Sequence, residues 1–163
     1  MKKLIYTLLI IITLTNNSFA AGSSGDGGSV AKISNYTKAK NLIKAAKKYE
    51  KKGKTEKAQK RYAKAQKLLL KSDKEKPLQA DTLNYLGFTT RKLGDYEKGE
   101  EFYLKGLQIE PNHAGINEYL GELYIVTNRM NLAKERLNIL KSCNCKEYKQ
   151  LKEIIEGTKK SKY

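Results

Sequence analysis

Residues 83–121 read LNYLGFTTRKLGDYEKGEEFYLKGLQIEPNHAGINEYLG, and this stretch carries the clearest evidence for the fold. The pair Leu86-Gly87 recurs as Leu120-Gly121, which is 34 residues further along the chain. A small residue directly after a leucine allows two helices to approach closely, while the larger neighbours fill the space beside them. A fixed spacing between two such pairs indicates an internal repeat.

The same interval separates two turn signals. Asn128 occupies the position equivalent to Gly94, again 34 residues later. Gly94 suits the left-handed conformation that ends many helices, and Asp95 suits the N-cap of the helix that follows. The repeating unit is therefore predicted to be two short helices joined by a tight turn.

Helical spacing extends to both sides of this stretch. Apolar residues recur at steps of three and four, and no segment shows sustained strand-like alternation. The stripe of the first predicted helix consists of Tyr36, Ala39, Leu42, Ile43, Ala46 and Tyr49. The stripe of the second consists of Ala58, Tyr62, Ala65, Leu68 and Leu69. The pattern predicts helices throughout.

A 34-residue period of helix–turn–helix units resembles the tetratricopeptide repeat, and the chain resembles such proteins of the exported bacterial type. The second unit carries the motif most fully. Its matching positions are Leu86-Gly87, Gly94-Asp95-Tyr96, Tyr103, Gly106 and Pro111, with Leu83 at the aromatic opener and Thr90 at the first-helix tyrosine. Gly99 and Gly106 stand where the motif has small packing residues.

The two flanking units match less well. Residues 114–140 keep Leu120-Gly121, Tyr124 and Ala133 but have Asn117 at the opener and Leu140 at a usually small position. Residues 39–72 lack the Leu-Gly pair, and seven extra residues, 73–79, separate them from the second unit.

The resemblance implies an all-α, tetratricopeptide-like solenoid of about three repeats, and we assign it to residues 32–157. The last repeat of such a stack needs a cover. Residues 147–156 supply one, since Tyr148, Leu151 and Ile154 form one apolar stripe on an otherwise charged helix. Residues 158–163 are expected to form a frayed tail.

The first 31 residues are expected to lie outside the fold. Lys2 and Lys3 precede an apolar run at 4–14, and Ser18 and Ala20 are the small residues before a cleavage site. This pattern predicts a signal peptide at 1–20, because eleven helical residues span only about 16 Å of a roughly 30 Å hydrocarbon core. Residues 21–31 are rich in Gly and Ser and predict a flexible linker. The mature protein is then periplasmic or secreted, with no transmembrane span.

The charge is large and uneven. The chain has 33 Lys and Arg against 17 Asp and Glu, which gives a formal net charge of +16. Residues 32–76 hold 17 of the basic residues and four of the acidic ones, so this segment, which contains the first repeat, contributes +13. Such a field attracts anions, and export argues against nucleic acid. A general bias toward lysine on solvated faces would give the same charge. A functional basic repeat and a compositional bias therefore both stay open.

The residues give little support for catalysis or metal binding. His113, the one histidine, follows Pro111 in a turn, so we expect no enzyme activity and no cofactor. Cys143 and Cys145 are separated by one residue, which does not match structural zinc spacing. A disulfide, two free thiols or a redox pair remain possible, and an oxidising compartment favours the disulfide.

The resemblance implies a protein-binding scaffold that presents a groove, lined by the first helix of each repeat, to a peptide or protein partner. The predicted lining residues are Lys47, Lys51, Asn84, Phe88, Arg91, Lys92, Glu118 and Glu122. The charge of such a groove would change from positive at the first repeat to negative at the third. Arg91 could bind a carboxylate through two parallel hydrogen bonds. Phe88 could instead pack against the neighbouring repeat. The alternative function is an anion- or envelope-surface-binding module that uses the lysine-rich first repeat.

Overall fold

The computed structural model describes residues 33–161, and the predicted signal peptide and linker lie outside them. Seven α-helices and one short 3₁₀ turn make up this part of the chain, with no strand among the described residues. The helices are α1 (Asn35–Lys51), α2 (Thr55–Glu75), α3 (Ala80–Lys92), α4 (Tyr96–Ile109), α5 (Ala114–Val126), α6 (Met130–Leu140) and α7 (Lys146–Ile155).

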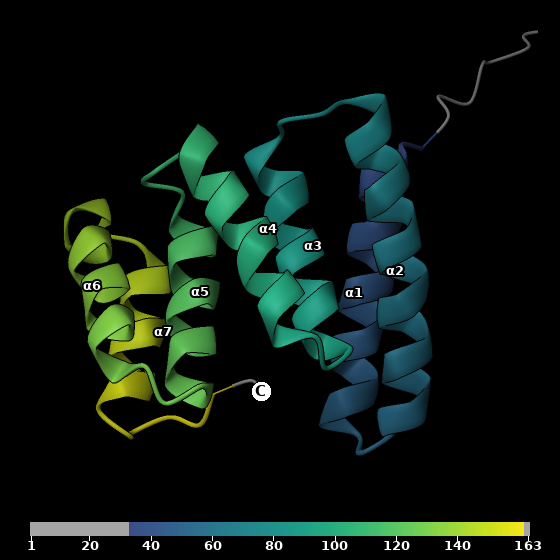
Figure 1. Ribbon diagram of the computed structural model, residues 1–163. Helices are drawn as coiled ribbons and strands as arrows, with labels where there is room; N and C mark the ends of the chain where they lie inside the picture. The colour runs from purple at the N-terminus through teal and green to yellow at the C-terminus, as the bar shows by residue number, and fades with distance from the viewer. Residues whose placement is uncertain (1–32, 162–163) are drawn as a thin grey trace, which may run out of the picture. The chain divides into compact units, whose positions relative to one another are not determined.

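The helices form three antiparallel pairs and a cap. Helix α1 packs on α2, α3 on α4, and α5 on α6, while α2 with α3 and α4 with α5 join successive pairs. Figure 1 shows the pairs following one another, with α7 against the last pair. The all-α solenoid predicted from the sequence is confirmed. No helix within 33–161 has the length and apolar character needed to cross a membrane.

Two predicted helix-turn signals take the expected conformation. Gly94 has φ of +99°, and Asn128, at the equivalent turn of the next repeat, has φ of +59°. The left-handed region excludes most residues, which is why glycine and asparagine occupy these two turns. The side chain of Asp95 accepts a hydrogen bond from the Lys98 amide at 2.9 Å and so caps α4 as predicted.

Small residues set the spacing within the second repeat. A Cβ atom on Gly87 would lie 2.5 Å from Cε1 of Tyr103, whose side chain is fully buried on α4. Helices α3 and α4 can therefore cross at this distance only because residue 87 has no side chain. The recurring Leu-Gly pair has the packing role that its spacing suggested.

The first repeat is longer than the 34-residue period. Helix α2 continues to Glu75, so three of the seven extra residues extend the helix and the rest form the link to α3. Leu78 in this link has φ of +59° and is 71% exposed. The insertion thus lengthens α2 without adding a further element.

The C-terminal cap forms, but the tail after it differs from the prediction. Leu151 and Ile154 of α7 are buried, and α7 packs on both α5 and α6. The amides of Thr158 and Lys159 donate to the Glu153 carbonyl, and the Ser161 hydroxyl donates to Glu122. The prediction of a frayed tail is wrong for residues 158–161, because polar groups of α5 and α7 hold them. Residues 162–163 lie outside the described part of the chain.

Candidate partner-binding site

The first helices of the repeats meet along one face, which we call the inner face and define by α1, α3 and α5. Lys47 of α1 donates from its Nζ to the Tyr119 hydroxyl of α5 at 3.2 Å. The same ammonium group lies 4.3 Å from the centroid of the Phe88 ring of α3. Side chains of all three helices therefore touch at one point.

A pocket of about 230 Å³ opens on this face between α1 and α3. We call it the lysine pocket, and its lining residues are Lys47, Glu50, Lys51, Phe88 and Lys92. Four of these five were predicted as groove residues from the sequence. Three ammonium groups against one carboxylate give the pocket a formal charge of +2, so it favours an anionic group.

Glu50 is held by two donors. Lys92 Nζ lies 2.6 Å from Glu50 Oε1, and the Tyr62 hydroxyl donates to Glu50 Oε2 at 2.7 Å. Burial, and next the hydrogen bond to Glu50, raise the pKa of Tyr62, which stays a neutral donor at physiological pH. Glu50 was not among the groove residues predicted from the sequence. It lies one helical turn from Lys47 on the same face of α1, and this spacing could have identified it as a lining residue.

Phe88 forms the apolar floor of the pocket and is only 1% exposed. Its ring packs edge-on against Tyr62 with centroids 5.7 Å apart and lies 5.1 Å from the ring of Tyr119. Phe88 thus belongs mainly to the core, as the packing alternative in the sequence analysis stated. The prediction that it projects into an open groove is wrong, because α1, α2 and α5 supply aromatic and aliphatic neighbours on several sides.

The other half of the predicted groove is buried. Asn84, Arg91, Glu118 and Glu122 are each less than about a tenth exposed. Arg91 Nη1 donates to the Tyr119 carbonyl at 2.7 Å, and its Nη2 lies 4.0 Å from Glu122 Oε2. Arg91 is therefore not displayed for a partner's carboxylate.

The acidic end of the groove is covered by the chain itself. Glu122 Oε2 accepts a hydrogen bond from the Ser161 hydroxyl at 3.1 Å, so the C-terminal tail reaches the side chain that was expected to face a ligand. The expected positive-to-negative gradient is wrong. Helix α5 packs on α3, α4, α6 and α7, and that many neighbours leave little of it at the surface.

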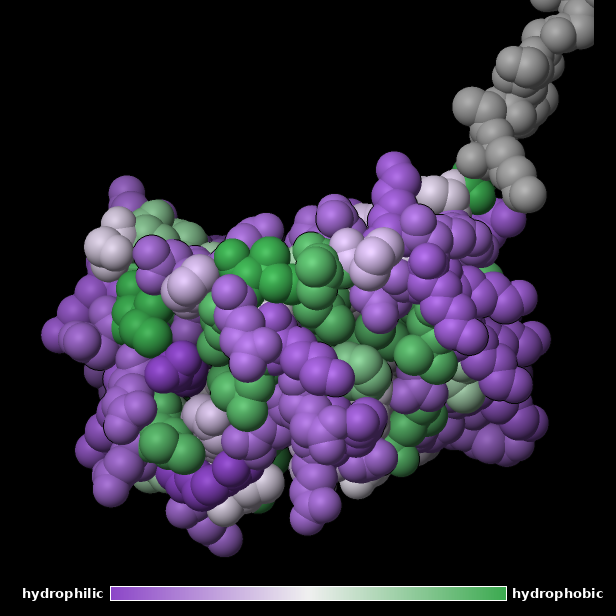
Figure 2. Space-filling view, turned by 45° about the horizontal axis from the view of Figure 1, so that its top comes forward, coloured by the Kyte–Doolittle hydropathy of each residue, from purple (hydrophilic) through white to green (hydrophobic). Residues whose placement is uncertain are grey.

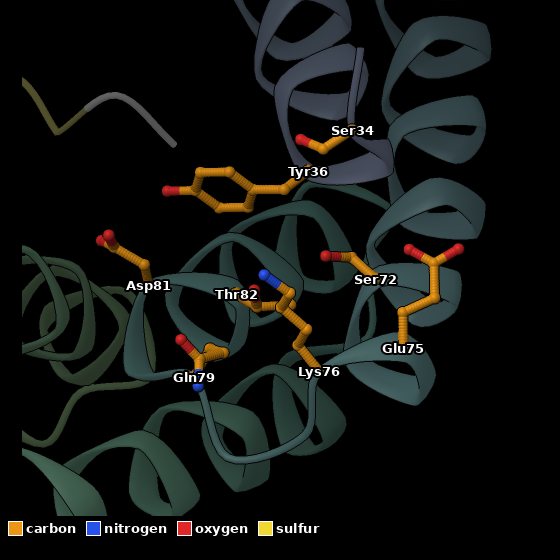
Figure 3. Close-up of a pocket in the computed structure, with 8 residues that line it drawn as sticks. All are labelled: Ser34, Tyr36, Ser72, Glu75, Lys76, Gln79, Asp81 and Thr82. Carbon is orange, nitrogen blue, oxygen red and sulfur yellow. The ribbon is translucent and has the colours of Figure 1, made fainter. Parts of the chain in front are cut away.

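A second, polar pocket of about 250 Å³ lies where α1 begins, α2 ends and α3 begins. Figure 3 shows the Tyr36 ring extending across it with the hydroxyl toward Asp81, while Lys76 and Gln79 approach from the link. Burial, and next the charge of Asp81, raise the pKa of Tyr36. No sequence pattern predicted this pocket, because three separate helix ends contribute to it. Its lining combines hydroxyl groups with charges of both signs and selects no ligand class.

The remaining chemistry-bearing residues have structural roles. His113 caps α5, because its Nδ1 accepts from the Ile116 amide at 3.1 Å, which leaves Nε2–H to face Asp81 Oδ1 at 3.3 Å. Cys143 and Cys145 form a disulfide in this structure, which is the alternative that an oxidising compartment favours. The bond closes the turn that leads into α7. Within 33–161 no three His, Cys, Asp or Glu side chains gather as a metal site.

Comparisons with known proteins support the fold more than any particular partner. No family model matches the chain. A stretch of 72 residues, 42% of this chain, is 39% identical to the Sol locus transcriptional repressor of Clostridium acetobutylicum. That stretch covers 23% of the repressor, so this chain matches less than a quarter of its relative's length.

Among solved structures, a chain of the CopN-Scc3 complex is similar, with a TM-score of 0.50 and 17% sequence identity. The match covers 81% of this chain and 79% of that chain. A likeness at this identity bears on the fold alone. Together with the seven helices, it shows that residues 33–161 form an all-α helical solenoid.

Proposed function

We propose that this protein is a scaffold that binds an extended, acidic segment of a protein partner at the lysine pocket. The observation that carries the proposal is the pocket itself, which three lysines line together with the buried ring of Phe88. A carboxylate entering there would meet Lys51 at the exposed rim and Lys47 and Lys92 deeper in. Charge-assisted hydrogen bonds of this kind orient a ligand and strengthen its binding.

The arrangement of the site favours binding over catalysis. The cations are held on helices, and burial raises the pKa values of Tyr62 and Tyr119 beside them, so both hydroxyl groups stay neutral and act through hydrogen bonds. The similarity in fold to a chain of the CopN-Scc3 complex, a protein assembly by its name, is a further point of support. We therefore propose a binding protein and not an enzyme.

The proposed location is the periplasm or the cell exterior. It depends on the amino-terminal pattern of two lysines, an apolar run and a small-residue cleavage site. Cleavage after Ala20 would give a mature chain that begins at Ala21. The intact mass of protein from the periplasmic fraction tests this, and a chain that keeps Met1 in the membrane pellet would contradict it.

Site-specific crosslinking tests the scaffold proposal. The photoreactive amino acid p-benzoylphenylalanine is placed at the pocket rim, in place of Lys51. The matched control carries it in place of Lys105, an exposed lysine of α4 away from the pocket. We expect a discrete crosslinked protein from the first position alone, with the crosslink in an acidic segment.

A peptide with the crosslinked sequence then gives the affinity. Lys51→Glu should weaken its binding by at least tenfold, because a like charge then faces the carboxylate, while Lys105→Glu should leave the dissociation constant unchanged. Titration calorimetry measures both. Equal crosslinking at the two positions, or equal affinity of the two variants, would exclude the lysine pocket as the site.

A further inference from the structure

The outer face of α2 carries a straight row of cations, which we call the lysine stripe. Its members are Lys57, Lys60, Lys64, Lys67, Lys71 and Lys74, at successive steps of three and four residues. This spacing keeps all six on one side of a helix, over about 25 Å of its length. All six are exposed.

The stripe lies opposite the packed side of α2. The buried residues of this helix are Ala58, Tyr62, Ala65, Leu69 and Ser72, about half a turn away from the lysines. Helix α2 packs on α1 and α3, which leaves its outer side to solvent at the first-repeat end of the stack (Figure 1). The region over α1 and α2 in Figure 2 is mostly hydrophilic.

Acidic residues neutralise little of this row. Glu56 pairs with Lys60 at 2.6 Å, at one end of the helix. At the other end Glu75 accepts a hydrogen bond from Asn35. Between Lys57 and Lys74 the one acidic residue is Asp73, which lies on the far side of the helix and is half-buried. The stripe therefore presents a concentrated positive field.

We propose that the lysine stripe docks the protein on a lipid bilayer that contains anionic lipids. A straight row of exposed ammonium groups can reach a flat surface along its whole length. Each lysine near an anionic membrane strengthens binding by roughly fivefold, and the contributions accumulate along a row. Lysine carries a compact point charge on a flexible stem. It is therefore better suited to binding mobile lipid headgroups than to binding a fixed acceptor that requires two parallel hydrogen bonds.

The composition of the face favours lipid over nucleic acid. Single-stranded nucleic acids bind where aromatic rings alternate with cations, because the bases stack on the rings. The aromatic residue of α2, Tyr62, is fully buried on the opposite side. Tyr49 of α1 lies beside Lys57, Lys60 and Lys64 at one end of the stripe, so an aromatic ring adjoins this end of the row but does not alternate with the lysines along it. Leu70, 42% exposed, lies beside the stripe between Lys67 and Lys74, where it can enter the interface. One leucine gives little apolar insertion, so docking is peripheral and sensitive to salt.

Docking through α2 leaves the lysine pocket open. The pocket is lined from α1 and α3, with no contribution from α2, whose packed side faces those two helices. A bound partner and a bilayer can therefore be held at once. The inference does not depend on the proposed partner site, and either could fail without the other.

Vesicle co-sedimentation with two charge-matched variants of the full chain tests the proposal. One variant combines Lys64→Gln, Lys67→Gln and Lys71→Gln. The control combines Lys105→Gln, Lys134→Gln and Lys141→Gln, three exposed lysines of the later repeats. Both lose three positive charges, so only the position of the charges differs. Circular dichroism checks that both keep the parent's helicity.

The vesicles contain phosphatidylcholine with about a third phosphatidylglycerol, and pure phosphatidylcholine vesicles measure any contribution of the apolar run at 4–14. On the anionic vesicles the stripe variant should lose roughly a hundredfold in partitioning, and the control less than threefold. High salt should release the parent protein.

Three outcomes would overturn the proposal. Equal losses in the two variants would assign the binding to net charge alone. Equal binding of the parent to anionic and zwitterionic vesicles would leave no role for the stripe. Tighter binding to a single-stranded oligonucleotide than to vesicles at equal phosphate concentration would assign the stripe to nucleic acid.

Discussion

Helices α2 and α5 place their charged residues in opposite environments. Of the 21 residues of α2 five are buried, and none of these is charged. Of the 13 residues of α5 eight are buried, and Glu118 and Glu122 are among them. The number of neighbours explains the difference, because α2 packs on α1 and α3 while α5 packs on α3, α4, α6 and α7.

This difference changes what a charged residue contributes to stability. An exposed lysine of α2 keeps its hydration, so its removal costs the fold little. Glu122 and Arg91 have fully buried side chains and depend on each other and on polar atoms nearby. Removing one member of such a group leaves the other uncompensated, which is costly. Substitutions in the two helices should therefore have very different effects.

Loss of the cap should have the largest effect. Deleting residues 147–163 removes buried Leu151 and Ile154 and uncovers the side of α5 that holds Gly121 and Glu122. At roughly 1.5–3 kcal/mol for each large side chain, we expect a loss of about 3–6 kcal/mol in the free energy of unfolding. Urea denaturation followed by circular dichroism measures it. Deleting 158–163 alone is the control and should cost much less, and equal melting temperatures for the deletion and the parent would disprove the capping role.

Arg91→Ala should come next. It removes the buried guanidinium near Glu122 and the donor to the Tyr119 carbonyl, so about 3–5 kcal/mol should be lost. The same denaturation experiment applies, with Lys105→Ala, an exposed lysine of α4, as the control. If Arg91→Ala costs no more than Lys105→Ala, the buried cluster does not stabilise this fold.

Gly87→Ala should have an intermediate effect. The new methyl group would meet the flat, buried ring of Tyr103, and such overpacking costs about 1–3 kcal/mol. Gly121→Ala is the comparison, because its methyl group would meet the end of the flexible Leu151 side chain at 2.6 Å. We expect Gly87→Ala to lower the melting temperature more than Gly121→Ala. The reverse order would mean that the α5–α7 contact is the tighter of the two.

Single lysines of the stripe should have the smallest effect on stability. Lys67→Ala removes an exposed side chain, so the free energy of unfolding should change by less than about 0.5 kcal/mol. Alanine's higher helix propensity could even make the change slightly favourable. A loss above 1 kcal/mol in urea denaturation would show that the stripe takes part in the fold, in conflict with a surface reserved for docking.

Much of the fold could be predicted because its signals are local. Gly94 and Asn128 mark left-handed turns, Asp95 marks an N-cap, and Leu86-Gly87 marks a close crossing, each through a preference of one or two residues. The spacing of such residues also gave the number of helix pairs. Four lining residues of the lysine pocket could be predicted because they lie on the first helices of two adjacent repeats.

Whether the other predicted groove residues are exposed depends on how many sides of each helix are covered by neighbouring helices. A periodic pattern identifies one apolar stripe per helix, so residues off the stripe of α3 and α5 were expected at the surface. Arg91, Glu118 and Glu122 lie off those stripes and are nevertheless buried. Their helices have neighbours on further sides, and a charged residue gives no local signal that distinguishes a solvated face from a satisfied buried one.

The all-α class, the helix pairs, their turns and the cap follow from local sequence signals, because backbone preferences and apolar spacing act within a few residues. Which charges face solvent depends on how the helices pack together. This packing leaves the lysines of α2 exposed, sets Glu50 into the lysine pocket and places Ser161 over Glu122. Contacts between residues as far apart as 122 and 161 depend on the packing of whole helices, and no local pattern encodes them.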